Sequence, residues 1–292
     1  MLTSGTTGAP KAAVLTHDAV AASARATSAR LAVDPATDRW LACLPLAHVG
    51  GLGVVTRAVL TGTPLTVVPN VESAAPDDGA TLVSLVPAQL PRVDPARFRT
   101  ILLGGSAMPP DLPPNAVPTY GMTETGGGVV YAGTPLDGVE LRADAEGQLL
   151  VRAPMLLRAY RDGTDPRDTD GWYPTGDAGT WDPEARRVTV AGRIGDVIVT
   201  GGEKVWPGPV EARLAEHPAV REALVFGRPD PTWGRRVVAR VVPAPAAGGE
   251  QPTLDDLRGW VKEALPPWAA PHELELVADL PRTALGKLRR AP

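Results

Sequence analysis

Short apolar runs alternate with a helical pattern over the first half of the chain. The runs are rich in the aliphatic residues typical of buried strands, and they occupy residues 40–44, 65–68, 81–86 and 100–103. Residues 18–31 are rich in alanine and place apolar positions at helical spacing, which predicts an amphipathic helix. Strands that alternate with helical stretches favour an α/β fold.

Past Gly138 the apolar runs become shorter and are separated by Gly, Pro and Asp turns. Such short runs, at residues 139–142, 148–152 and 188–191, predict a small barrel or a distorted sheet. A further change after Gly192 predicts a separate unit of about 100 residues, a normal size for a compact domain. Its expected elements are a helix at 209–216, strands at 220–226 and 236–242, and a helix at 254–265.

The fold class that these patterns predict is α/β with two domains. We expect a large N-terminal α/β domain with a β-rich subdomain over residues 1–191. A small α+β C-terminal domain follows over residues 192–292. With 292 residues, of which 43% are hydrophobic, the chain can bury a core in each.

Charge and cysteine content narrow the classes of partner. The formal net charge is -4 and both signs are mixed along the chain, which gives no basic surface for nucleic acid or for an anionic membrane. The most apolar stretch, residues 49–68, is broken by Arg57 and several glycines, so we expect no membrane span and no signal peptide. One cysteine, Cys43, excludes an internal disulfide and favours the cytoplasm. A homo-oligomer is compatible with this composition.

The first candidate for chemistry lies at the N-terminus, where Thr3 to Lys11 read TSGTTGAPK. Hydroxyls, a lysine and glycines that expose backbone N–H groups form a nest suited to polyphosphate. The segment does not fit the Walker pattern, because the spacing from Gly8 to Lys11 differs and no Ser or Thr follows the lysine. Taken alone, it is equally compatible with an ordinary turn.

Three further polar clusters follow in the sequence. YGMTET at residues 120–125 offers Thr123 as a donor to a phosphate oxygen and Glu124 as a single carboxylate for magnesium, or alternatively as a solvated turn residue. Asp177 ends the run WYPTGD, where a carboxylate can accept both hydroxyls of a ribose. Arg193 belongs to the run GRIGD. Each of these clusters is weak alone, since Asp in a turn is usually capping or solvated.

In this order the clusters resemble the superfamily of adenylate-forming enzymes, which includes acyl-CoA synthetases, firefly luciferase and peptide-synthetase adenylation domains. The resemblance extends over essentially the whole chain. TSGTTGAPK is similar to the phosphate loop of that superfamily, LPLAHVGG (44–51) to its acyl-pocket motif, YGMTET to its adenine and magnesium motif, and YPTGD to its ribose motif. GRIGDVIVTGGEKVWPGPVE (192–211) is similar to its hinge and thiolation region, and PRTALGK (281–287) to its catalytic-lysine motif. Six motifs in the correct order argue against coincidence.

The resemblance implies an enzyme that uses ATP and Mg²⁺ to activate a small carboxylic acid as an acyl-adenylate, and then passes the acyl group to coenzyme A. It makes the C-terminal domain a mobile lid that carries Lys287 to the α-phosphate. It also assigns Glu124 to magnesium, Thr123 to catalysis, and His48 to the acyl pocket. The residues that it assigns to ATP, to the acyl pocket or to the pantetheine arm are Thr3, Ser4, Gly5, Thr6, Thr7, Gly8, Lys11, Gly104, Gly105, Ser106, Tyr120, Gly121, Asp177, Arg193, Gly201, Gly202 and Glu203.

The lysines support this assignment. Only four of the 29 basic residues are lysine, and three of the four, Lys11, Lys204 and Lys287, fall inside these motifs. Attack of a carboxylate on the α-phosphorus brings two anions together, and a positioned ammonium offsets their repulsion. The alternative for Lys287, a basic tail with Arg289 and Arg290, is the weaker interpretation.

Within the superfamily the chain looks most like the short o-succinylbenzoate–CoA ligases of menaquinone biosynthesis. LTSGTTGAPKAAVLTH, SLVPAQLPRV, ILLGGSAMPP and YGMTETGGGVVYAGTPLDGV carry this resemblance. His48 is expected either against the substrate or as a packed or capping residue.

The sequence departs from the superfamily pattern in two ways. Gly195 stands where a polar hinge residue is usual, and only Met1 and Leu2 precede the phosphate loop. We therefore expect a domain that is truncated at its front, or a naturally short branch.

Three alternatives stay open at this point. The chain is also compatible with a short- or medium-chain fatty acyl-CoA ligase, and with an adenylation domain that loads a carrier protein. A third interpretation is an inactive nucleotide-binding fragment. Retention of the set Lys11, Glu124, Asp177, Arg193 and Lys287 argues against this last one, since a relic has no physical need of all five.

Overall fold

The computed structural model describes residues 1–3, 11–75, 78–106, 108–109, 111–245 and 251–282. The chain divides into two compact units. The first comprises Met1–Thr175 and Thr180–Thr189, and the second comprises Gly176–Gly179 and Val190–Pro292.

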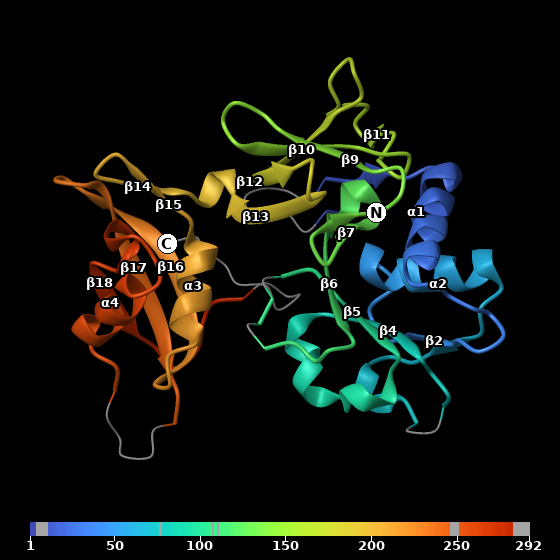
Figure 1. Cartoon of the computed structure of the whole chain (residues 1–292), viewed down its shortest axis with the longest axis horizontal. Coiled ribbons are helices and arrows are strands. Elements are labelled where there is room, and N and C mark those ends of the chain that lie inside the picture. The colour runs from blue at the N-terminus through green and yellow to red at the C-terminus, as the bar shows by residue number, and fades with distance from the viewer. Residues whose placement is uncertain (4–10, 76–77, 107, 110, 246–250, 283–292) are drawn as a thin grey trace. The chain divides into compact units, whose positions relative to one another are not determined.

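A seven-stranded sheet forms the base of the first unit (Figure 1). Its order is β3-β2-β4-β5-β6-β7-β8, and the neighbours from β3 to β6 pair in parallel whereas β7 and β8 are antiparallel. All residues of β2, β4 and β5 are buried, as expected for parallel strands covered on both faces. The strands are β2 (Trp40–Ala42), β3 (Leu65–Val67), β4 (Leu82–Leu85), β5 (Thr100–Leu103), β6 (Ala116–Met122), β7 (Gly127–Tyr131) and β8 (Thr134–Pro135).

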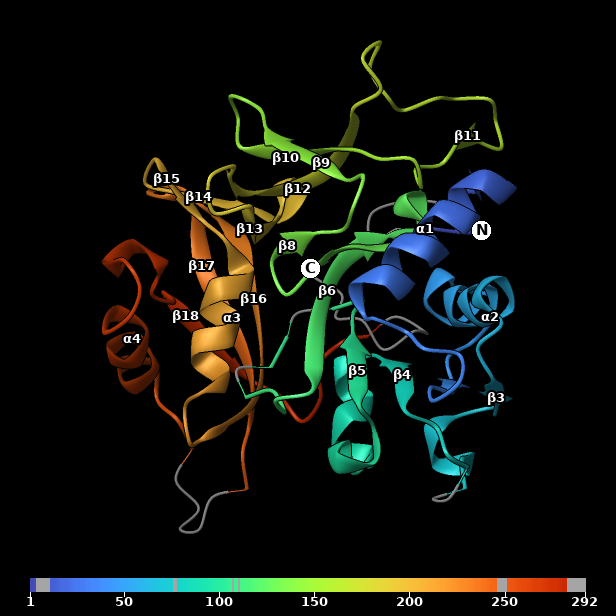
Figure 2. The ribbon, with the colours of Figure 1, turned by 45° about the vertical axis from the view of Figure 1, so that its right-hand side comes forward.

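Two helices pack against each other beside this sheet (Figure 2). Helix α1 (His17–Arg30) is capped by Thr16, whose side chain accepts the Ala19 N–H at 3.1 Å, and it confirms the helix predicted at 18–31. Helix α2 (Val49–Thr61) was not predicted, because its glycines lower helix propensity. Burial against β2 and β4 compensates for that low propensity.

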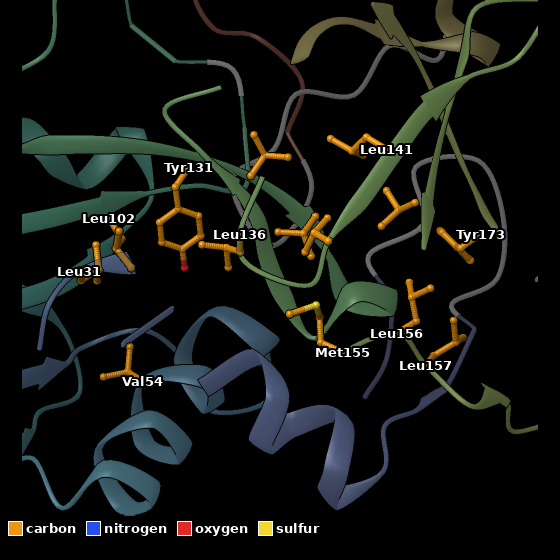
Figure 3. Close-up of a cluster of buried hydrophobic side chains, with 14 of the residues drawn as sticks. Leu31, Val54, Leu102, Tyr131, Leu136, Leu141, Met155, Leu156, Leu157 and Tyr173 are labelled. Carbon is orange, nitrogen blue, oxygen red and sulfur yellow. The ribbon is translucent and has the colours of Figure 1, made fainter. Parts of the chain in front are cut away.

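A second sheet, of four strands, confirms the prediction of a distorted β-rich part. Its strands are β9 (Glu140–Ala143), β10 (Gln148–Arg152), β12 (Tyr173–Asp182) and β13 (Arg187–Arg193), in the order β13-β12-β10-β9. A separate pair joins β1 (Ala13–Val14) to β11 (Ala159–Tyr160). Figure 3 shows the common core, where Leu136, Met155 and Tyr131 lie among side chains from both parts of the unit.

The second unit is a five-stranded sheet with two helices. The order β15-β14-β17-β16 is extended by β18, which pairs in parallel with β17. Its elements are β14 (Ile198–Thr200), β15 (Glu203–Val205), α3 (Pro207–Ala215), β16 (Val220–Asp230), β17 (Gly234–Pro243), α4 (Leu254–Lys262) and β18 (Glu273–Leu276). Leu214 on α3 and Leu257 on α4 are fully buried against this sheet. The small α+β arrangement that the sequence predicts is confirmed.

The α/β fold class is therefore confirmed, whereas the predicted domain boundary after residue 191 stays a prediction. Among the described residues, no helix has both the length and the apolar character that a membrane crossing requires.

Candidate active site

The two ends of the predicted phosphate loop are neighbours in space. Thr3 N–H donates to the Lys11 carbonyl at 2.8 Å, and Lys11 N–H donates to Thr3 Oγ1 at 3.0 Å. Ala13 N–H continues this ladder to the Met1 carbonyl at 2.8 Å. The pairing holds Lys11 at the base of the loop. Five predicted phosphate-binding residues lie outside the described residues, namely Ser4, Gly5, Thr6, Thr7 and Gly8.

Strand pairing brings Lys11 to Tyr160, a residue that the sequence analysis did not identify. Because Ala13 pairs with Tyr160 in the β1–β11 ladder, the Lys11 ammonium lies 4.8 Å from the centroid of the Tyr160 ring. The Tyr160 hydroxyl donates to Oε1 of Glu124 at 3.0 Å and lies 3.5 Å from the Tyr173 hydroxyl. Burial, with the nearby charge of Glu124, raises the pKa of Tyr160, so the hydroxyl keeps its proton at neutral pH.

Local hydrogen bonds fix the backbone around Glu124. Strand β6 passes directly into the 3₁₀ turn Thr123–Thr125, where Met122 N–H donates to Thr125 Oγ1 at 2.9 Å. The Glu124 carbonyl accepts the Leu157 N–H at 2.7 Å. Thr123, the predicted phosphate donor, is half-buried beside it. The motif YGMTET thus places Glu124 at the end of a strand that is central to the sheet.

The environment of Glu124 fits a magnesium ligand. Its side chain is buried, and within the described part of the chain it forms no ion pair. No group of three or more His, Cys, Asp or Glu residues that could hold a metal occurs among the described residues. A single carboxylate is what Mg²⁺ uses when phosphates and waters supply its other ligands. Mg²⁺ held there with ATP would neutralise charge on the phosphates.

Further predicted residues lie where parallel strands end. Gly104, Gly105 and Ser106 follow β5, and a Cβ on Gly104 would lie 2.6 Å from Thr119 Oγ1 of β6. Gly105 has φ 88°, a conformation that favours glycine. Tyr120 follows on β6. Ligands of open α/β sheets bind outside the carboxyl ends of the strands, so this edge suits nucleotide and acid binding.

Gly121 lies where the chain approaches itself most closely in this motif. A Cβ at this position would be 2.0 Å from the Gly127 carbonyl oxygen of β7. We predict that Gly121→Ala lowers the stability of the protein by about 3 kcal/mol, because backbone rather than a flexible side chain blocks the methyl group. Thermal unfolding measures this. Gly195→Ala is the control, since its Cβ would meet nothing within 4 Å. Equal melting temperatures for both variants would contradict the prediction.

His48 occupies the N-cap position of α2, and its backbone is extended there. Its side chain makes no capping hydrogen bond, so the capping alternative is not what the structure shows. The imidazole is half-buried, and its role in the acyl pocket stays a prediction.

Arg57 on α2 is the second residue that the sequence analysis did not assign to the site. Its Nε–H donates to the Gly53 carbonyl at 2.7 Å, Nη2 lies 3.4 Å from Ser84 Oγ, and the guanidinium lies 4.6 Å from the centroid of the Trp40 ring. Among the described residues its buried Nη1 has no hydrogen-bond partner, and the side chain forms no ion pair. Burial lowers the pKa of Arg57, but a guanidinium stays charged at neutral pH. A signal was present in the sequence, since Arg57 is the one charge in the apolar stretch 49–68.

The predicted ribose residues belong to the second unit and contact each other. Nε of Arg193 lies 3.0 Å from Oδ1 of Asp177, whose side chain is buried. Gly176 has φ 72°, and a Cβ there would lie 3.3 Å from Nη1 of Arg193. The sequence motifs assign the two residues to nucleotide binding separately, whereas in the structure they form an ion pair.

The predicted thiolation residues form a tight turn in the second unit. Gly201 and Gly202 have φ 57° and 87° and connect β14 to β15, where Thr200 pairs with Glu203. Positive φ at both central positions is what a two-residue hairpin of type I′ requires, which explains both glycines without a ligand. Glu203 is exposed at the base of the turn. Binding of a pantetheine arm here stays a prediction, and the predicted catalytic Lys287 lies outside the described residues.

Comparison with known proteins identifies the class to which this fold and site belong. The AMP-binding enzyme family matches residues 1–161, and the C-terminal domain of AMP-binding enzymes matches residues 209–287. The chain belongs to the AMP-binding enzyme family. The resemblance to adenylate-forming enzymes that the motifs predict is therefore confirmed.

Two relatives are named for the same activity. A probable 2-succinylbenzoate–CoA ligase of Mycobacterium tuberculosis is 41% identical over 318 residues, which cover 99% of this chain and 82% of that protein. The 2-succinylbenzoate–CoA ligase of Bacillus cytotoxicus is 34% identical and covers 99% of this chain and 68% of its own length.

Solved structures agree with these relatives. The o-succinylbenzoate–CoA synthetase of Bacillus subtilis, in complex with the acyl-adenylate intermediate, matches with a TM-score of 0.86 and 29% identity over 99% of this chain and 67% of that one. The same enzyme with ATP and magnesium ion matches with a TM-score of 0.85 and 29% identity, over 99% and 68% of the two chains.

Proposed function

We propose that the protein is an AMP-forming acid–CoA ligase that activates 2-succinylbenzoate for menaquinone biosynthesis. The curated relatives that cover the chain carry this name, and the motifs for ATP and for the thiol are present in order. A carboxylate oxygen of the acid attacks the α-phosphorus of ATP, and the bond to pyrophosphate breaks. The CoA thiol then attacks the acyl carbon, loses its proton and releases AMP.

Individual residues of this chain take separate roles in ATP binding and in adenylate formation. Lys11 lies beside the phosphate loop, and Glu124 is the carboxylate available to magnesium. Asp177, held by Arg193, accepts the ribose hydroxyls. Lys287 brings a positive charge to the α-phosphate and to the attacking carboxylate, because two anions must meet there.

The observation that carries the choice of acid is the buried guanidinium of Arg57. 2-Succinylbenzoate has two carboxylates, and only one becomes the adenylate, so the other keeps its charge inside the protein. A buried charge is costly unless an opposite charge meets it. Arg57 offers that charge on α2, whose N-cap is His48 of the acyl-pocket motif, and its Nη1 has no hydrogen-bond partner among the described residues. We assign the ring carboxylate of the acid to Arg57.

The three alternative functions differ from this proposal in the acid, in the thiol acceptor or in catalysis itself. A fatty acid has no second anion to meet Arg57, which argues against the short- or medium-chain acyl-CoA ligase. A carrier-protein acceptor changes only the thiol, so it is tested by the second half-reaction. An inactive nucleotide-binding fragment would bind ATP and release no pyrophosphate.

Pyrophosphate release tests the proposal. Purified protein receives ATP and magnesium with 2-succinylbenzoate, with C4 to C12 fatty acids, or with 4-oxo-4-phenylbutanoate, which lacks the ring carboxylate. We expect release that is selective for 2-succinylbenzoate and that increases when CoA is added. Preference for fatty acids, or no release from a folded protein that binds ATP, would reject it.

We place the reaction in the cytoplasm, where ATP and CoA are available. The thiol of Cys43 is buried, which raises its pKa to about 11 and leaves it unreactive. Size-exclusion chromatography with light scattering will establish whether the protein forms a homo-oligomer.

A further inference from the structure

One side chain connects the base of the phosphate loop to the magnesium carboxylate. The ring of Tyr160 lies under the Lys11 ammonium, with 4.8 Å from Nζ to the ring centroid, and its hydroxyl donates to Glu124 Oε1 at 3.0 Å. Tyr160 is 8% exposed and belongs to the main core of its unit. The sequence motifs assign nothing to this tyrosine.

We propose that Tyr160 is a positioning residue that orients the Glu124 carboxylate for Mg²⁺ and holds Lys11 beside the same phosphates. The proposal adds a residue to the site described above and rests on the proposed function only through its use of magnesium and ATP.

The geometry gives Tyr160 control over one carboxylate oxygen. A carboxylate accepts through both oxygens, and a donor that holds Oε1 fixes the rotation of the group and leaves Oε2 to meet a cation. The backbone on the other side of Glu124 is also held, since its carbonyl accepts the Leu157 N–H at 2.7 Å. Partners that orient a metal ligand in this way set metal affinity.

The aromatic face of Tyr160 acts on the other group. Pairing of Ala13 with Tyr160 fixes the ring relative to the strand that leaves the phosphate loop. An ammonium over such a face gains cation–π stabilisation, which restricts the flexible lysine chain. Lys11 is exposed, so without the ring its ammonium would be free to turn into solvent.

The test distinguishes the effect of the Tyr160 hydroxyl from that of its ring. ATP binding is measured by calorimetry across a series of Mg²⁺ concentrations, without any carboxylic acid, for wild type and Tyr160→Phe. We expect the Mg²⁺ concentration for half-maximal tight binding to rise roughly 10- to 100-fold in Tyr160→Phe, because the carboxylate loses its orienting donor. Binding in EDTA stays unchanged, because the ring under Lys11 remains. Tyr160→Leu, which removes ring and hydroxyl, weakens binding in EDTA as well.

Tyr131→Phe is the matched control. Tyr131 is also buried in the same core, and its hydroxyl shares a hydrogen bond of 3.0 Å with Thr27 Oγ1 instead of with Glu124. Tyr131→Phe also loses one buried hydroxyl hydrogen bond, so its melting temperature falls, while its Mg²⁺ dependence stays that of wild type. A Tyr160→Phe curve that coincides with the Tyr131→Phe curve overturns the proposal. Failure of 2-succinylbenzoate to react would reject the proposed substrate without altering these binding curves.

Discussion

Arg57→Met is expected to lower kcat/KM for 2-succinylbenzoate roughly 100-fold, because removing one partner of a buried charge pair typically costs 2–5 kcal/mol. The lost charge is the one that we assign to the ring carboxylate. In the wild type its Nη1 is buried without a hydrogen-bond partner among the described residues, so a carboxylate bound against it would satisfy an unpaired donor. The loss of activity should therefore depend on which acid is used, and not on the binding of ATP.

Stability is expected to change in the opposite direction. A buried charge that no opposite charge meets costs folding free energy, so its replacement by an apolar side chain of similar volume is neutral or stabilising. Arg57 is 8% exposed and forms no ion pair within the described part of the chain. The melting temperature of Arg57→Met should equal or exceed that of wild type, as is common where a binding group is kept at the expense of stability.

Paired substrates make this measurement specific. Wild type and Arg57→Met are compared with 2-succinylbenzoate and with 4-oxo-4-phenylbutanoate, and the ratio of kcat/KM for the two acids is the quantity of interest. The ratio should fall to near one in the variant. Arg25→Met, at an exposed position of α1, is the control. An equal loss with both acids would show that Arg57 supports the helix and not the second carboxylate.

Lys287→Ala is expected to reduce adenylate formation by about 100- to 1,000-fold, the usual effect of removing one positioned group that stabilises transition-state charge. The thioester step, started from preformed acyl-adenylate and CoA, should continue at the wild-type rate, because no phosphate anion is attacked there. Pyrophosphate release and thioester formation are measured separately.

Lys262→Ala is the matched control for this change. Lys262 is the one lysine outside the motifs, and it lies exposed at the end of α4. Both half-reactions should be unaffected by its loss. A Lys287→Ala variant that slows the two half-reactions equally would remove the lysine from the adenylation step and favour a role in folding or in lid movement.

Short stretches of sequence predicted those helices and strands whose burial pattern and turn residues lie within a few positions of each other. The strand expected at residues 100–103 is β5, and the helix expected at 18–31 is α1 to within one residue at either end. Helix α2 was missed, since Gly50, Gly51 and Gly53 oppose a helix in isolation. A Cβ on Gly51 would lie 2.4 Å from the Pro45 carbonyl oxygen, so the close packing that requires glycine also stabilises the helix.

The sequence by itself determined the class of chemistry, because each motif gathers its groups within a few residues. Thr3 and Lys11 are eight positions apart and hydrogen-bond to each other, and Gly201 with Gly202 make a turn that requires their positive φ values. Contacts of this kind depend on short-range geometry and not on how distant strands pair.

Only the tertiary structure decided which distant groups act together. Tyr160 reaches Glu124 across 36 positions, and Arg57 reaches Ser84 across 27. Neither contact has a local signature, because each depends on how strands and helices pair in space, and a shift of one residue in a strand turns a side chain to the opposite face. Burial makes each contact energetically important. A charge or hydroxyl that is removed from water needs a partner from elsewhere in the chain or from a ligand.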